Sequence, residues 1–187
     1  VVARPLEQGR KQAIERLSLG SGDRILIPGC GTGSDLKYLP PGAHVTAIDA
    51  APAMVRRTRA RAERLGLEVD ARVGDAQALP FEDGAFDAVL LHLILSVVPD
   101  PKAVAAETAR VLASGGRVSV YDKFAPENEE SSLLRRALNP VARFLFSDLT
   151  RRLEPLLSSA SLEVKGARET VLGGLYTVAV AAHTSVE

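Results

Sequence analysis

The stretch Arg24–Gly33 reads Arg-Ile-Leu-Ile-Pro-Gly-Cys-Gly-Thr-Gly, and the rest of the chain is interpreted from it. The apolar run Ile25–Ile27 breaks into a loop with a glycine at every second position. Helix-compatible sequence follows over Ser34–Leu39, and a second apolar run, His44–Ile48, ends on Asp49. A strand, a glycine-rich turn, a helix, a strand and an acid, in that order, predict the first half of a nucleotide-binding α/β unit.

The glycine spacing narrows the choice of ligand. Glycines allow a ligand to approach the backbone closely, and a carboxylate at the end of the second strand can accept both hydroxyls of a ribose. The pattern is Gly29-x-Gly31-x-Gly33, so the third glycine of the dinucleotide fingerprint falls on Ser34. The phosphate-loop sequence Gly-Lys-Ser/Thr is also absent from the chain. Both facts disfavour NAD(P) and ATP.

Composition excludes several classes of function. The 187 residues fit one domain, and 23 Lys+Arg balance 23 Asp+Glu, which argues against a nucleic-acid surface. Cys30 is the single cysteine, so an internal disulfide or a cysteine zinc cluster cannot form, and the three histidines have no metal-ligand spacing. The first residues are polar, and the longest apolar run, 88–98, is too short to span a bilayer. We therefore expect no metal site and a cytoplasmic protein.

The remaining sequence alternates between strand and helix patterns up to about residue 121. This alternation predicts right-handed crossovers and a parallel sheet. From Ala125 to Ala160 no clear strand occurs, and two helical pieces are expected, at about 132–146 and 149–159. Two final strands joined at Gly173-Gly174 predict an antiparallel hairpin. The elements expected outside the insertion are helices over 5–19, 52–65 and from 101 up to Gly115-Gly116, and strands over 25–27, 45–48, 67–73, 86–95, 117–121, 162–171 and 175–182.

The motifs resemble those of the class I S-adenosylmethionine methyltransferases. The loop Gly29–Gly33 is similar to motif I of that family, and the stretches beginning at Asp49, Gly74, Phe86 and Ala109 follow in the family's order. The resemblance implies an α/β fold, a Rossmann-like doubly wound seven-stranded sheet of order 3-2-1-4-5-7-6 with an antiparallel terminal hairpin. It also implies one methyltransferase domain over 1–187, with a helical substrate lid inserted at about 125–160.

The same resemblance implies a set of cofactor contacts for S-adenosylmethionine, whose product would be S-adenosylhomocysteine. Asp49 would bind the ribose, Met54 would lie under the adenine, and Asp75 would face the adenine amino group. Two positions depart from the family: Ile27 stands where an acid usually meets the cofactor's ammonium group, and Ala51 replaces a small hydroxyl residue. The implied contacts are Gly29, Cys30, Gly31, Gly33, Asp49, Ala50, Met54, Asp75, Ala76 and His92.

Candidate catalytic residues are those expected at the carboxyl ends of strands four and five. Methyl transfer is an in-line displacement that needs alignment and exclusion of water, and an amine or hydroxyl acceptor can need a base. His92 is the base candidate, and Tyr121 and Asp122 end the next strand at the same rim. Purely structural roles remain open for both residues. His92 could be a histidine near the core whose hydrogen bonds are all made within the protein, and Asp122 could merely end its strand.

The acceptor is predicted to be a small molecule or a lipid. Strand four does not end in the Asp/Asn-Pro-Pro-aromatic motif of many base- and glutamine-methylating enzymes, so no nucleic acid is expected. Apolar residues alternate with arginines over 132–157, which predicts peripheral contact with an anionic membrane at its inner face, or else a lid with a solvated outer side. Together, the stretch Ser96–Pro101, the loop at Phe124 and the segment inserted after it resemble soluble bacterial phosphatidylethanolamine N-methyltransferases, and also the ubiquinone/menaquinone C-methyltransferases. We predict a methyltransferase that acts on a small-molecule or lipid acceptor, with N-methylation of a phospholipid amine as one form of this activity. The alternatives are a polar small-molecule methyltransferase, a non-catalytic S-adenosylmethionine-binding module and, third, a dehydrogenase.

Overall fold

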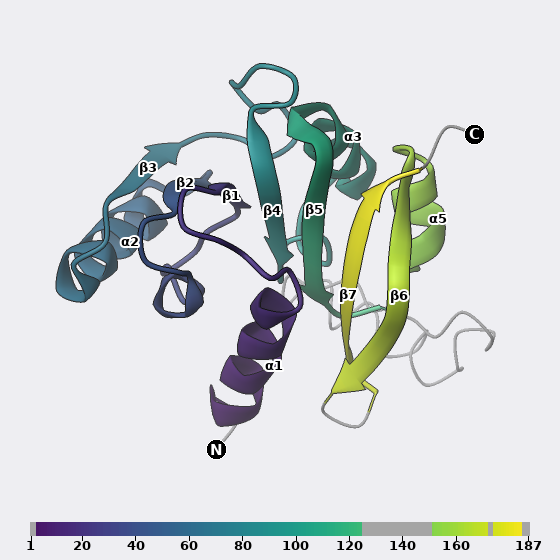
Figure 1. Ribbon diagram of the computed structural model, residues 1–187, viewed down its shortest axis with the longest axis horizontal. Coiled ribbons are helices and arrows are strands. Elements are labelled where there is room, and N and C mark those ends of the chain that lie inside the picture. The colour runs from purple at the N-terminus through teal and green to yellow at the C-terminus, as the bar shows by residue number, and fades with distance from the viewer. Residues whose placement is uncertain (1–2, 125–150, 172–173, 185–187) are drawn as a thin grey trace.

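A seven-stranded sheet with the order β3-β2-β1-β4-β5-β7-β6 forms the centre of the molecule (Figure 1). The computed structural model describes residues 3–124, 151–171 and 174–184. The predicted helix over 132–146 and most of the predicted membrane-contacting segment lie outside these residues. The strands are β1 (Arg24–Pro28), β2 (His44–Asp49), β3 (Val69–Val73), β4 (Phe86–His92), β5 (Leu112–Asp122), β6 (Leu162–Val171) and β7 (Tyr176–His183).

The strand pairing confirms the predicted topology. The β1, β2, β3, β4 and β5 strands pair in parallel, whereas β7 pairs antiparallel with both β5 and β6. The carboxyl ends of the five parallel strands therefore lie at one edge of the sheet, and the loops that follow them can build one site. The terminal hairpin closes the sheet on the β5 side, as the sequence predicts.

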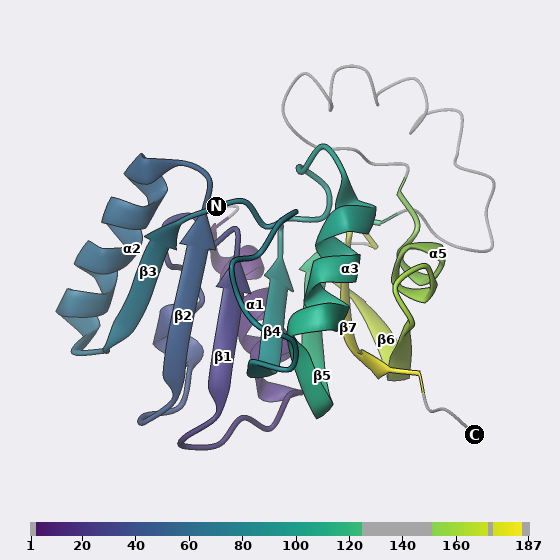
Figure 2. The same cartoon turned by 90° about the horizontal axis from the view of Figure 1, so that it is seen from above.

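Helices cover both faces of the sheet. Figure 2 shows α3 and α5 in front of the sheet and α1 behind it. Buried residues of α3 and α5 pack with Leu26, Val89 and Leu91, while those of α1 and α2 pack with Ile25 and Ala88 on the other face. The neighbouring residues of one strand thus point into two different cores, as period-2 alternation requires. The helices are α1 (Ala3–Glu15), α2 (Pro52–Leu65), α3 (Pro101–Val111) and α5 (Leu153–Ser158), and a 3₁₀ turn, η1, covers Leu36–Tyr38.

The predicted helix over Ser34–Leu39 is wrong. The chain forms turns and then only η1, which ends before Pro40. Asp35 is turned into the interior and is 3% exposed, where it is bound by Arg10 and His92. Tertiary contacts to a buried carboxylate thus replace the regular helix that local sequence favours.

Other elements differ from the prediction mainly in their ends. α2 ends at Gly66, which has φ 65° and caps the helix as predicted. α3 ends earlier than predicted, at Val111, because β5 already begins at Leu112 and includes the Gly115-Gly116 pair. β4 ends at His92, and the next residue, Leu93, has φ 59°, a left-handed conformation that no strand can continue.

Candidate active site

The loop between β1 and η1 is built on three glycines in left-handed conformations. Gly29, Gly31 and Gly33 have φ values of 66°, 55° and 70°, which other residues adopt only with strain. Gly29 also permits a close approach, since a Cβ there would lie 2.6 Å from Cδ1 of Ile94. The loop is anchored to β2 by the Cys30 N–H, which donates to the carbonyl of Ile48 at 2.9 Å.

Asp49 ends β2 and joins this loop to the start of α2. Its Oδ2 accepts from the Gly31 N–H at 2.8 Å, and its Oδ1 accepts from the Ala51 N–H at 2.9 Å. Each carboxylate oxygen retains a second lone pair, so the hydroxyls of a ribose can still be bound. The carboxylate therefore anchors the loop and keeps lone pairs that a ligand can use.

A pocket of about 370 Å³ opens where the loops after β1, β2, β3 and β4 meet. This volume lies within the range of roughly 300–1,000 Å³ that small-molecule sites occupy. The pocket brings together six residues of the predicted set, which are Gly29, Gly31, Asp49, Ala50, Asp75 and Ala76. Sequence reasoning did not select the others, which are Gly74, Gln77, Leu93, Ile94, Val97, Val98 and Pro99.

Asp75 is held by Gln77, one of the residues that the sequence did not point to. The backbone N–H and the side-chain amide of Gln77 both donate to Asp75, and these hydrogen bonds lower the pKa of its carboxyl. The Oε1 of Gln77 accepts from the Asp100 N–H at 2.9 Å, and Asp100 caps α3 through the N–H groups of Lys102 and Ala103. This network joins the loop after β3 to the start of α3. The signal for Gln77 was its place two residues after a motif acid.

Four other predicted cofactor residues do not line this pocket, and one of them, His92, is described separately below. Cys30 is buried, its Sγ accepts from Thr58 Oγ1 at 3.4 Å, and burial raises the pKa of its thiol. Gly33 packs closely on Leu36 and Thr58, and Met54 is half-buried on α2. Their roles as cofactor contacts stay predictions.

His92 lies at the end of β4, and its side chain is completely buried. Its Nδ1 is 2.7 Å from Asp35 Oδ1, and its Nε2 is 2.9 Å from Ser119 Oγ. Ser119 donates its only proton to the carbonyl of Ala13 at 3.0 Å, so it must accept from Nε2–H. An ionised Asp35 only accepts, so both ring nitrogens of His92 act as donors and the imidazole is cationic.

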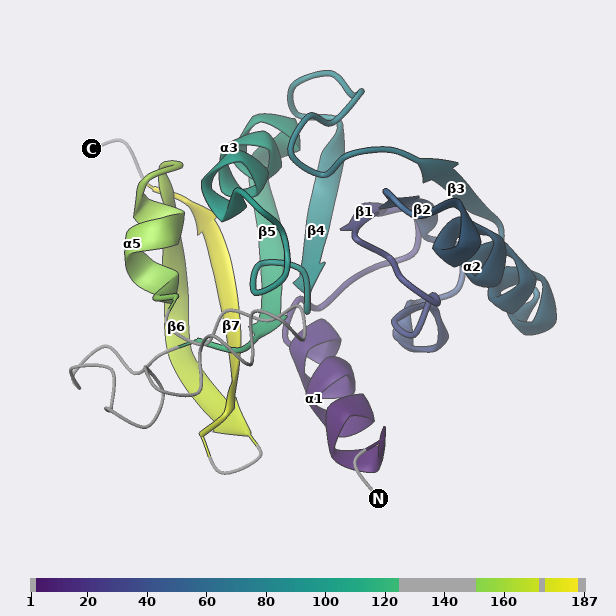
Figure 3. The same ribbon diagram turned by 180° about the vertical axis from the view of Figure 1, so that it is seen from behind.

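Arg10 of α1 also binds Asp35. Arg10, Asp35, His92 and Ser119 together form a network of hydrogen bonds that holds α1 against the sheet. The Nη1 of Arg10 donates to both oxygens, at 2.9 and 2.7 Å. Burial alone would raise the pKa of Asp35, but the charge and hydrogen bond of His92, together with those of Arg10, lower it to about 2. Figure 3 shows α1 beside the carboxyl ends of β4 and β5, where this network lies.

Tyr121 and Asp122 end β5 and are both fully buried. The Tyr121 ring packs under Gly9 of α1, 5.5 Å from the ring of Tyr176, and burial raises the pKa of its hydroxyl to about 12. That hydroxyl has no hydrogen-bond partner among the residues that the structure describes. Asp122 accepts from the N–H groups of Ser96 and Lys123, at 3.0 and 2.7 Å, and its burial raises its pKa. Neither side chain lines the pocket of about 370 Å³.

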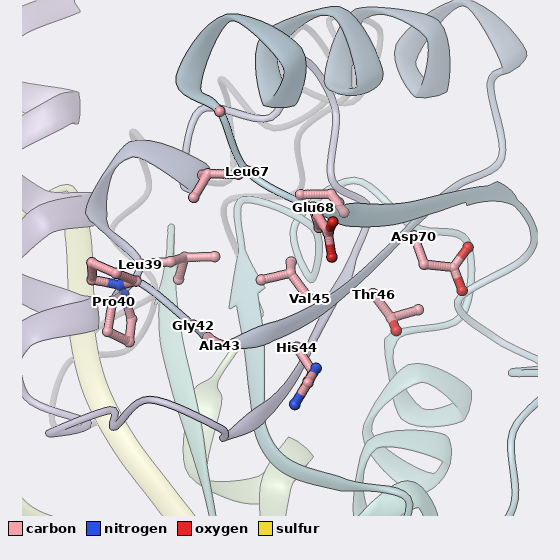
Figure 4. Close-up of a pocket in the computed structure, with 13 residues that line it drawn as sticks. Leu39, Pro40, Gly42, Ala43, His44, Val45, Thr46, Leu67, Glu68 and Asp70 are labelled. Atoms are coloured by element: carbon pink, nitrogen blue, oxygen red, sulfur yellow. The ribbon is translucent and has the colours of Figure 1, made fainter.

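A larger hollow, of about 960 Å³, lies at the amino ends of β2 and β3, away from every predicted site residue. Figure 4 shows the imidazole of His44 and the carboxylates of Glu68 and Asp70 spread around it rather than turned toward one point. The smaller pocket combines glycine backbone, two carboxylates and apolar side chains, which is the combination that ligand sites use. We therefore take the smaller pocket as the candidate active site.

These residues fit a cofactor with a nucleoside part. The glycines leave the backbone open, Asp49 offers free lone pairs, and Ile94, Val97 and Val98 offer apolar surface to a flat ring. Ile27, by contrast, is 2% exposed and packs in the core of the α1 face. An ammonium group at the end of β1 thus meets no acid from that position, as the sequence predicts.

Comparisons with known proteins agree with this site. A family model described as a methyltransferase domain matches residues 26–120. The phosphatidylethanolamine N-methyltransferase of Cereibacter sphaeroides is 34% identical over 158 residues, which cover 83% of this chain and 78% of that protein. The demethylmenaquinone methyltransferase of Thermus thermophilus is 39% identical over 131 residues, 70% of this chain but only 56% of that protein.

Among solved structures, the YcgJ protein of Bacillus subtilis has the same fold. Its TM-score is 0.80 at 18% identity, with 96% of this chain and 99% of that chain covered. The strand order of the sheet and the family match over residues 26–120 both indicate a methyltransferase. The glycine loop with Asp49 agrees with this, so the third alternative, a dehydrogenase, is excluded. The chain belongs to the methyltransferase domain family, and it is an enzyme whose cofactor is S-adenosylmethionine.

Proposed function

We propose that this methyltransferase N-methylates the amine headgroup of a phospholipid. The observation that carries the proposal is the likeness to the Cereibacter phosphatidylethanolamine N-methyltransferase, which extends over most of both chains. The Thermus relative is named for a demethylmenaquinone, a second lipid acceptor, and it matches a shorter part of its own length. A lipid acceptor is therefore common to both relatives, and the amine is favoured by the longer match.

The described residues near the cofactor pocket have the character that such an acceptor needs. Leu93 lines the pocket and also packs against the cluster of Tyr121, Tyr176 and Val178. The Nζ of Lys123 lies 5.5 Å from the centre of the Tyr176 ring, at the same edge of the sheet. The partly exposed Leu93 and Lys123 thus offer an apolar contact and a cation near the pocket, which suits a lipid that carries a phosphate.

In this proposal the chain positions the acceptor rather than activating it. When bound, S-adenosylmethionine supplies an electrophilic methyl group on a sulfonium. The acceptor amine attacks in its neutral form, and its proton goes to water. His92 is assigned a positioning role because both of its nitrogens donate hydrogen bonds. Tyr121 and Asp122 are assigned packing and anchoring roles because both are buried outside the pocket.

Membrane contact through 132–157 stays a separate prediction. No helix among the described residues is long and apolar enough to cross a bilayer. Most of that segment lies outside the described residues, so its role must be tested directly, by sedimentation with anionic vesicles.

The acceptor is tested by supplying methyl-labelled S-adenosylmethionine with one acceptor at a time. Vesicles of phosphatidylethanolamine are compared with dissolved phosphoethanolamine and with vesicles that carry demethylmenaquinone. Label in the phospholipid supports the proposal. Label only in phosphoethanolamine would favour the polar alternative, and label only in the quinone would favour C-methylation. No label with any acceptor, while S-adenosylhomocysteine still binds, would contradict the proposal and point to an acceptor outside these three classes. The Asp49→Ala variant is the control, and it should lose transfer to every acceptor.

A further inference from the structure

The loop after β4, residues 93–99, forms one wall of the cofactor pocket, and we name it the post-β4 loop. Five of its residues line the pocket, and Ile94 lies directly over Gly29. Within the loop, the N–H groups of Val97 and Val98 donate to the carbonyl of Ile94 at 3.0 and 3.1 Å. The position of this short loop relative to Gly29 therefore determines how wide the pocket is.

Asp122 holds the loop from the end of β5. Its Oδ2 accepts from the Ser96 N–H, and its Oδ1 accepts from the Lys123 N–H. Asp122 is 0% exposed, so this hydrogen bond does not compete with water. A buried carboxylate that accepts from backbone N–H groups forms hydrogen bonds about twice as strong as those between neutral groups.

Arg151 holds the same loop from a distant part of the chain, just before α5. Its Nη1 donates to the carbonyl of Leu95, and its Nη2 donates to the carbonyl of Val98 at 2.9 Å. The planar guanidinium thus bridges two carbonyls three residues apart, which a lysine ammonium cannot match in geometry. The post-β4 loop is held by an anion at one N–H and by a cation at two carbonyls.

We propose that Asp122 and Arg151 are positioning residues of the cofactor pocket: from outside the pocket, they fix the post-β4 loop at the separation from Gly29 that binds S-adenosylmethionine. Neither side chain lines the pocket, so their effect on the cofactor acts through the loop. The effect concerns the cofactor alone and does not depend on the identity of the acceptor.

The test uses the full chain with the substitutions Asp122→Asn and Arg151→Met, singly and together. Asparagine keeps the shape of the carboxylate, and methionine keeps the aliphatic stem of arginine. Calorimetric titration with S-adenosylhomocysteine should show binding about tenfold weaker for each single variant, the equivalent of one lost charge-assisted hydrogen bond. Because both residues act on one loop, the double variant should lose less than the product of the two single effects.

Arg152→Ala is the matched control, because Arg152 is the exposed neighbour of Arg151. Its binding constant should stay within about twofold of the original. Arg151→Lys should lie between the original and Arg151→Met, since one ammonium replaces the fork.

A readout on the loop separates positioning from general stability. Hydrogen exchange in the ligand-free protein should rise in the peptide that covers 93–99 in both variants, while peptides of β1 and β2 keep their protection. Binding of S-adenosylhomocysteine within twofold of the original in both folded variants would overturn the proposal. So would weaker binding with unchanged exchange in the loop.

Discussion

Asp35 and Asp122 are both buried at the carboxyl edge of the sheet, but they have different partners and opposite pKa shifts. On the α1 side, Asp35 meets Arg10 and the imidazolium of His92, and its pKa falls to about 2. On the side of the post-β4 loop, Asp122 meets backbone N–H groups, and its pKa rises because burial dominates. The comparison shows that the neighbours of a buried acid, rather than the depth of burial alone, determine the direction in which its pKa shifts.

The two acids also have different tasks. Asp35 joins residues of α1, η1 and β4 through paired charges, so its main contribution is to the stability of the fold. Asp122 fixes a wall of the cofactor pocket, so its main contribution is to affinity. The substitutions described below test whether the two acids differ in this way.

The change with the largest expected effect on stability is Asp35→Asn. It leaves the Arg10 guanidinium and the His92 imidazolium buried without a counter-ion, which should lower the free energy of unfolding by about 3 kcal/mol. Urea unfolding measures the loss. Asp83→Asn is the control, since that carboxylate is 81% exposed and should change stability by less than about 0.5 kcal/mol. A loss below about 1 kcal/mol for Asp35→Asn would mean that the buried pair is not intact in solution.

The pH dependence of stability should separate the two acids by sign. The folded-state pKa of Asp35 is depressed from 3.8 to about 2, so its contribution is present above pH 4 and is lost as pH falls toward 2, by about 2 kcal/mol. The pKa of Asp122 is raised above 3.8, so the folded state keeps that proton to a higher pH than the unfolded chain does, and the contribution of Asp122 to stability falls as pH rises above about 4.

Urea unfolding between pH 2 and 7 checks both signs. Asp35→Asn should flatten the loss of stability below pH 4, whereas Asp122→Asn should remove a fall in stability above pH 4. Slopes that change in the same direction in both variants would contradict the contrast.

A smaller effect is expected from Ser119→Ala on the α1 side. The change removes the acceptor of His92 Nε2 and the donor to the Ala13 carbonyl, so stability should fall by about 1–2 kcal/mol. Thr108→Val on α3 is its counterpart, because the buried Thr108 hydroxyl has no partner within the described part of the chain. Thermal unfolding should show a loss for the first and none for the second. Equal losses would show that the hydrogen bonds of Ser119 contribute nothing measurable.

The smallest effect is expected from Tyr121→Phe. The change removes a buried hydroxyl without a partner among the described residues, so the free energy of unfolding should stay equal or rise by up to about 1 kcal/mol. Methyl transfer should be unchanged, since the proposal gives this hydroxyl no contact with substrate. A tenfold fall in kcat with normal stability would restore Tyr121 as a catalytic residue.

The parallel strands and the terminal hairpin were predictable from local patterns, whereas the order of the strands in the sheet came from the resemblance to the family. Buried parallel strands are continuous apolar runs, and a glycine-containing link between two late strands specifies a hairpin. The Ser34–Leu39 segment was not predictable, because its conformation depends on Asp35 meeting Arg10 and His92, which are far apart in sequence. Local propensity contains no information on such a meeting.

The residues of the candidate site also fall into those that the sequence predicts and those that it does not. Gly29, Gly31 and Asp49 were predictable because left-handed backbone and a strand-end acid leave a clear pattern. The apolar wall was missed because Ile94 lies within the predicted strand 86–95, and because Val98 was noted only as part of a stretch that resembles lipid methyltransferases. The burial of His92 was one of two interpretations of the sequence, because the partners of its ring nitrogens, Asp35 and Ser119, lie far away in the sequence.

Ile27 has a consequence for inhibitor selectivity. In related methyltransferases with an acid at this position, the carboxylate can bind the ammonium group on the amino-acid part of the cofactor, which we call its tail. An inhibitor that keeps this group therefore gains affinity for those enzymes. Here that position is apolar and buried, and the carboxylates in the described pocket are Asp49 and Asp75. A nucleoside inhibitor with its tail removed should therefore lose less affinity for this enzyme than for relatives with the acid, and so discriminate between them.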